Sequence, residues 1–177
     1  MSNFRFFRAV LCCALTLACV LALGACGQKS SDVDAQKAAL HIIETIEQNH
    51  HDDDLTAAPV LATPESLLAD YFDDSVLTIP MKSRAAYTAE DLYDVADYAI
   101  FVLEDAADAE KILTSCRRRV ADLARQYSDN YDLPQGEVVK TAIVGQRGNV
   151  VYLFITQQGK EAQALLLDIL GGKVLLE

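Results

Sequence analysis

Two stretches of this chain, Tyr98–Leu103 and Val150–Ile155, are apolar at every position. Successive side chains of a β-strand point to opposite faces of the sheet, so a strand that is apolar throughout needs cover on both faces. Strands of this kind lie in the middle of a sheet rather than at its edge. The two stretches therefore predict the central strands of one sheet in a domain of the α+β class.

A long amphipathic helix is predicted between these two strands. Asp105 has the residue type of a helix N-cap, and the helix is expected to continue to about Asn130. Its apolar residues recur at helical spacing and form one continuous stripe that includes Cys116. The stripe predicts that this face of the helix packs on the sheet and that Cys116 belongs to the core.

The residues after this helix predict a hairpin, a second helix and a short last strand. Val138–Gly145 and Val150–Thr156 are strand-like and flank the turn sequence Gln146–Asn149. Lys160–Leu170 has the pattern of an amphipathic helix that two glycines end. Lys173–Leu176 is then expected to form a strand at the edge of the sheet.

Residues 90–177 thus have the predicted order β-α-β-β-α-β of a ferredoxin-like fold. The two apolar stretches are its first and third strands, which are central in that sheet. Both helices of this fold cover one face of the sheet and leave the other face open. A large apolar patch left exposed there would mark a possible interaction face for a partner. Its side chains are Tyr98, Ile100, Val102, Tyr152 and Phe154.

The N-terminal part, residues 34–75, is predicted to be helical and to cover this open face at least in part. One helix is expected near Asp32–Asn49, and a shorter one begins at Thr63–Glu65, which supplies a cap, a first-turn proline and an acid. Residues 73–94 are expected to be irregular, with at most a brief strand at Val76–Ile79. The apolar side chains expected against the strands are Ile42, Ile43 and Ile46, or Leu67, Leu68 and Phe72.

The N-terminus of the chain has the pattern of a bacterial lipoprotein leader. Arg5 and Arg8 precede an uncharged apolar run, and Leu23, Gly24 and Ala25 come directly before Cys26. A signal peptide has a basic start, an apolar stretch and small residues at its cleavage site. A cysteine at the next position is typical of the lipobox. The sequence therefore predicts that the signal peptide, residues 1–25, is removed and that the Cys26 thiol carries a diacylglyceryl group as a thioether.

Other interpretations of this leader stay open. The apolar run is at the short edge of what spans roughly 30 Å of hydrocarbon, so it could be a single transmembrane helix. It could also be an ordinary secretory signal with an incidental cysteine. Cys19, which follows Ala18, is a weaker alternative for the modified residue because it lies inside the apolar run.

Removal of the leader leaves about 150 residues, which suit one domain with its own core. Residues 26–33 are expected to form a short lipid-anchored tether, and residues 34–177 a single α+β domain. The whole chain has a formal net charge of −11, and the leader removes two further positive charges. Such an acidic chain is not expected to bind nucleic acid, which requires a basic surface. Beyond Cys26 only Cys116 remains, so no intramolecular disulfide is expected.

Three groups of residues could carry chemistry, and each has a plainer interpretation. His50, His51 and Asp52–Asp54 could bind a metal ion, but a hydrophilic run between helices is typical of a solvated loop. Arg117–Arg119 could bind an anion, but three consecutive helical residues point in different directions, so a solvated helix face is expected. Cys116 has no histidine near it in the sequence to act as a base. We therefore expect no catalytic residue, no metal, no cofactor and no enzyme activity.

Several features occur together in this chain, in addition to the lipobox. They are the strand Ala96–Leu103, the helix start Asp105–Lys111, Arg119-Val120, Tyr131 and the hairpin residues Gly148–Val151. Over about residues 90–170 this combination resembles a family of small lipoproteins of unknown function from Gram-positive, clostridial-type bacteria. The resemblance implies a Gram-positive envelope, and therefore attachment to the outer face of the plasma membrane.

These observations predict a cell-envelope lipoprotein that acts as a non-catalytic binding or interaction module. Its partners would be the membrane, through the lipid anchor, and an envelope protein. The alternative is a small-molecule or peptide-binding component of a transporter or sensor. One small domain lacks the two lobes that usually close over a solute, which disfavours this alternative.

Overall fold

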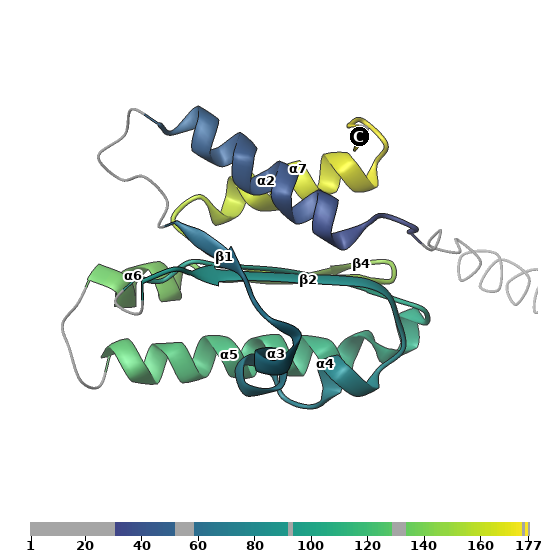
Figure 1. Cartoon of the computed structure of the whole chain (residues 1–177), viewed down its shortest axis with the longest axis horizontal. Helices are drawn as coiled ribbons and strands as arrows, with labels where there is room; N and C mark the ends of the chain where they lie inside the picture. The colour runs from purple at the N-terminus through teal and green to yellow at the C-terminus, as the bar shows by residue number, and fades with distance from the viewer. Residues whose placement is uncertain (1–30, 52–58, 92–93, 129–133, 175, 177) are drawn as a thin grey trace, which may run out of the picture.

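The computed structural model describes residues 31–51, 59–91, 94–128, 134–174 and 176. The predicted signal peptide, its Leu23–Ala25 recognition residues, Cys26 and most of the predicted tether lie outside these residues. Within the described parts, helices pack on both faces of one antiparallel sheet (Figure 1). The α+β class is therefore confirmed.

In the part of the chain that the structure describes, the sheet has five strands in the order β1-β2-β3-β5-β4. Their bounds are β1 Val60–Ala62, β2 Met81–Ala89, β3 Asp97–Leu103, β4 Ile143–Arg147 and β5 Val150–Ile155. The main helices are α2 Ala35–Asn49, α3 Glu65–Phe72, α5 Ala109–Ser128 and α7 Gly159–Leu170. The shorter ones are α4 Ser75–Thr78, a 3₁₀ turn at Ala106–Asp108 and α6 Pro134–Lys140.

The two apolar stretches form the centre of the sheet, as predicted. β3 and β5 pair with each other, and every residue of both strands is buried. Side chains on one face, such as Phe101 and Leu153, share a core with α3, α4 and α5. Side chains on the other face, such as Ile100 and Phe154, share a second core with α2 and α7 (Figure 1). Each central strand thus has helices on both sides, which is what its composition requires.

The ferredoxin-like topology is not confirmed. The strands β3, β5 and β4 do lie in the order and the antiparallel pairing predicted for the first, third and second strands, so the difference lies on the other side of β3. The strand β2 occupies the position next to β3 that the predicted last strand would take. Lys173, Val174 and Leu176 do not form a strand, because α7 continues to Leu170 and the Lys173 amide donates back to the Asp168 carbonyl.

Three local predictions also differ from the structure. Residues 76–78 belong to α4 rather than to a brief strand, and the irregular region predicted over residues 73–94 contains the nine-residue strand β2. The residues from Pro134 to Lys140 form α6, so the strand expected from Val138 begins only at Ile143.

The predicted interaction face is buried. None of Tyr98, Ile100, Val102, Tyr152 and Phe154 is more than 4% exposed. The reason is that α5 and α7 lie on opposite faces of the sheet rather than on the same one, and α7 covers this face together with α2 (Figure 1). The predicted cover by Ile42, Ile43 and Ile46 of α2 is confirmed, whereas Leu68 and Phe72 of α3 pack on the other face beside α5. The predicted interaction face, formed by Tyr98, Ile100, Val102, Tyr152 and Phe154, therefore offers no surface to a partner in the folded domain.

Candidate functional site

The chain that leads into α2 is bonded to one end of the sheet. The Ser31 amide donates to Asn149 Oδ1 at 2.6 Å, and Asn149 Nδ2 donates to the carbonyls of Ser31 at 3.1 Å and Leu103 at 2.7 Å. Asn149 lies in the turn between β4 and β5 and is only 2% exposed. A buried amide side chain that meets three backbone groups fixes the position of Ser31. The predicted tether, residues 26–33, is thus part of the folded domain from Ser31 onward.

The next residues are attached to β2. Ser83 Oγ donates to the Val33 carbonyl at 3.1 Å and accepts from the Ala35 amide at 3.0 Å. Lys82 forms an ion pair with Asp32. The Asp34 carboxylate then caps α2 by accepting from the amides at positions 36 and 37, as a helix N-cap requires.

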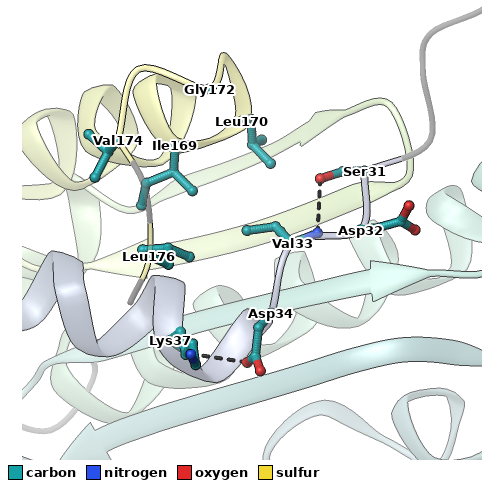
Figure 2. Close-up of a pocket in the computed structure, with 10 residues that line it drawn as sticks. All are labelled: Ser31, Asp32, Val33, Asp34, Lys37, Ile169, Leu170, Gly172, Val174 and Leu176. Carbon is teal, nitrogen blue, oxygen red and sulfur yellow. Dashed lines mark hydrogen bonds between the residues drawn. The ribbon is translucent and has the colours of Figure 1, made fainter.

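A hollow lies between this N-terminal segment and the C-terminal end of α7 (Figure 2). We call it the N-terminal groove; its volume is about 510 Å³. Figure 2 shows aliphatic side chains of α7 and of the segment after it facing Val33, with Asp32, Asp34 and Lys37 at the margin. The lining residues are Ser31, Asp32, Val33, Asp34, Lys37, Ile169, Leu170, Gly172, Val174 and Leu176.

The chemistry of the N-terminal groove suits binding of an apolar group. Its volume lies within the range of roughly 300–1,000 Å³ typical of small-ligand sites. The walls are mainly aliphatic, and Ser31 Oγ already accepts from the Val33 amide at 3.3 Å. The carboxylates of the groove already have partners, since Asp32 pairs with Lys82 and Asp34 caps α2. Burial of apolar surface is therefore the main interaction that the groove can offer.

This groove was not predicted, because the sequence of each wall is typical of another structure. Residues 26–33 were expected to be a free tether, and Lys173–Leu176 an edge strand. One signal was available, since apolar residues that follow a glycine helix stop often fold back onto the last turn of the helix. Val174 and Leu176, which follow Gly171 and Gly172, fit this pattern.

A second hollow, of about 120 Å³, contains a buried ion pair. Arg119 Nε lies 2.8 Å from Asp97 Oδ2, and its second terminal nitrogen lies 3.3 Å from Oδ1. The guanidinium also lies over the Tyr71 ring, 4.4 Å from its centroid. The expected solvated arginine face is therefore wrong for Arg119, although Arg117 and Arg118 are exposed. Since both charges of the pair neutralise each other, we assign it a structural role.

A third hollow lies where the end of α2 meets the start of α7, beside His50. His50 Nε2 lies 2.8 Å from Glu161 Oε2, and Asn49 Nδ2 donates to Glu161 Oε1 at 2.7 Å. These hydrogen bonds lower the pKa of the Glu161 carboxyl. Asp52–Asp54 lie outside the described residues, and the described part of the chain holds no group of three or more His, Cys, Asp or Glu side chains placed to bind a metal. His50, one of the two histidines considered as metal ligands, thus links the end of α2 to α7.

Cys116 is buried in the core below the sheet, as its position on the apolar stripe predicted. Burial raises the pKa of its thiol to about 12. Only the thiolate reacts as a nucleophile, and almost none is present at neutral pH with such a pKa. The structure therefore gives Cys116 a packing role.

We expect the native domain to resist a bulky thiol reagent at pH 8 for hours and to react fully in urea. Cys116→Ala should lower the free energy of unfolding by about 1 kcal/mol, because it removes only one buried sulfur. Cys116→Asp should largely unfold the domain, because it buries an unpaired carboxylate. Absorbance of the released reagent gives the reaction rate, and urea titration gives the free energies. Rapid reaction of the native protein would contradict the buried position.

The candidate site of this domain is therefore the N-terminal groove, where both ends of the domain meet. No helix among the described residues has the length and hydropathy to cross a bilayer. Comparison of the chain with family models, curated proteins and solved structures finds no match.

Proposed function

We propose that this chain is a cell-envelope lipoprotein whose single α+β domain is a non-catalytic binding module. The lipid on Cys26 would hold it at the outer face of the plasma membrane. The lipobox residues Leu23–Cys26 support the anchor.

One structural observation carries the proposal furthest: Ser31 is fixed beside the N-terminal groove only five positions after Cys26. A chain extends at most about 3.3–3.6 Å per residue, so Cys26 lies within about 18 Å of Ser31. A lipid on Cys26 would therefore keep the groove and the β4–β5 turn at the membrane side of the domain. The domain could not rotate freely away from the bilayer.

A binding role follows from what the groove contains. Its aliphatic walls can bury an apolar group, and its two carboxylates are already engaged, Asp32 with Lys82 and Asp34 as the cap of α2. The expected partner is an envelope protein or another apolar component at the membrane surface. The acidic character of the chain argues against nucleic acid as the partner.

The volume of the groove also favours a second candidate function, a small-molecule or peptide-binding component of a transporter or sensor. Native mass spectrometry of the protein purified from its own membranes separates the two. A bound small molecule or peptide of defined mass would favour the transporter or sensor component. Co-purification of one envelope protein at fixed stoichiometry would favour the interaction module.

We expect Cys26→Ser to abolish lipidation and to leave the precursor uncleaved, because the lipoprotein peptidase acts on the lipid-modified cysteine. The measurement is incorporation of a tagged fatty acid in growing cells, together with the mass of the purified chain. Cys116→Ser is the matched control and should keep the label, because Cys116 is buried in the folded domain. Persistent label on the Cys26→Ser protein would move the modification to Cys19 or refute the lipoprotein proposal.

A further inference from the structure

The N-terminal groove leaves aliphatic side chains in contact with water. Ile169 is buried, but Val33, Leu170, Val174 and Leu176 are each only partly buried around it. Each square ångström of apolar surface removed from water contributes roughly 25 cal/mol, so an apolar occupant would stabilise this arrangement.

We propose that the N-terminal groove holds one acyl chain of the lipid on Cys26. This inference rests on the proposed function, since it requires Cys26 to be lipidated. Ser31, Asp32 and Val33 are both the continuation of the anchor and part of the groove lining. The chain from Cys26 therefore enters the domain at the rim of the groove, with at most about 18 Å between Cys26 and Ser31.

Attachment to the same chain favours this occupant over a free one. A group tethered by a short flexible linker has an effective concentration in the millimolar range, without any search for the site. The bonds from Asn149 and Ser83 hold the groove end of the linker in place. The linker therefore cannot swing to another face of the domain before the acyl chain meets the groove.

The net charge of the chain favours a neutral lipid. The rim of the groove is mixed, since Lys37 lies there beside Asp32 and Asp34, and Asp32 pairs with Lys82. The chain as a whole, however, has a net charge of −11, which repels an anionic phospholipid. A diacylglyceryl thioether carries no charge, so its acyl chain can enter without this cost.

Transfer of an acyl chain from the bilayer to the groove costs little free energy, because both surroundings are apolar. The other acyl chain of the diacylglyceryl group remains in the membrane, where each methylene contributes about 0.8 kcal/mol. A single inserted chain gives only marginal anchoring, so filling the groove would weaken the attachment of the domain to the bilayer. Filling the groove would therefore stabilise the folded domain and at the same time weaken its attachment to the bilayer.

The test is photocrosslinking in cells that express the full chain and are fed a fatty acid carrying both a diazirine and an alkyne. After irradiation the protein is purified by the alkyne and digested, and its crosslinked peptides are sequenced by mass spectrometry. We expect crosslinks that join the Cys26 peptide to peptides containing Leu170 and Val174. Leu170→Asp should reduce these crosslinks at least tenfold. Leu77→Asp, on α4 at the opposite face of the sheet, is the matched control and should leave them unchanged.

Each other outcome has a defined meaning. Fatty acid on Cys26 without crosslinks to the groove would overturn this inference and leave the lipoprotein proposal intact. Absence of fatty acid from the chain would overturn both. Crosslinks in the groove that carry the mass of a phospholipid, instead of the Cys26 peptide, would show that the bilayer supplies the occupant and would also overturn the inference. The map of the unchanged protein decides the matter even if Leu170→Asp fails to fold.

Discussion

Replacement of Arg119 by leucine is expected to lower the free energy of unfolding of the domain by about 3 kcal/mol. The substitution leaves the Asp97 carboxylate, which is 3% exposed, without its bidentate partner. A buried charge that loses its partner costs about 3–5 kcal/mol, and we expect the lower end because the Arg119 side chain keeps some contact with water. The loss also removes the cation–π contact with Tyr71. Urea denaturation followed by circular dichroism measures the effect.

The neighbouring residue provides a matched control for this change. The Arg118 side chain is 62% exposed, and its nitrogens lie 3.9 Å from Asp73 and 3.7 Å from Asp122. Because exposed ion pairs contribute little, Arg118→Leu should change the free energy of unfolding by no more than about 0.5 kcal/mol. Equal effects at positions 118 and 119 would contradict the structural role of the Asp97–Arg119 pair.

A double substitution separates the cost of an unpaired charge from the loss of arginine packing. Apolar residues of similar volume can replace a buried ion pair at little or no cost. We therefore expect Asp97→Leu combined with Arg119→Leu to be more stable than Arg119→Leu alone. A double variant as unstable as the sum of the single variants would mean that packing, rather than the unpaired carboxylate, accounts for the loss.

The sequence predicted the centre of this fold better than its edges. The strands β3 and β5 are apolar at every position, and that composition permits only a central place with helices on both faces. The strand β2 was missed because its sequence is mostly small and polar, with Lys82, Ser83 and Arg84 in its first half. These side chains have partners far away in sequence: Lys82 pairs with Asp32, Ser83 bonds to Val33 and Ala35, and Arg84 donates to Val76. Such partners are not visible in a local pattern.

The same limit explains the error in topology. Hydrophobic periodicity showed that α5 and α7 are amphipathic, but not which face of the sheet each helix covers. The unpredicted β2 beside β3 left no place there for a last strand, and α7 joined α2 on the other face. The N-terminal groove results from that arrangement, because its walls come from residues 31–37 and residues 169–176, which α2 and α7 bring together. Only the predicted anchor motif that precedes the groove, Leu23–Cys26, can be recognised from contiguous residues.

Gly145→Ala is expected to destabilise the domain by about 2–3 kcal/mol, although Gly145 lies in an edge strand. Gly145 is paired with Tyr152 of β5, and the ring of that tyrosine lies across it. A Cβ at position 145 would lie 2.3 Å from Tyr152 Oη and 2.4 Å from Cζ, far inside van der Waals contact. The ring cannot move aside cheaply, because it is buried and stacked on Phe154 at 5.5 Å, and Gln163 donates to its hydroxyl at 2.7 Å. Urea denaturation again gives the free energy.

A double-mutant cycle shows whether the clash with Tyr152 is the cause. In a Tyr152→Leu background the ring is absent, so Gly145→Ala should cost less than about 1 kcal/mol even though Tyr152→Leu is itself destabilising. Gly136→Ala is the matched control, since the nearest atom to its added methyl would be at an ordinary 3.7 Å and alanine favours the helix α6. It should leave stability unchanged or raise it by up to about 1 kcal/mol. If Gly145→Ala cost the same with and without the Tyr152 ring, backbone conformation rather than close approach would be what requires glycine at this position.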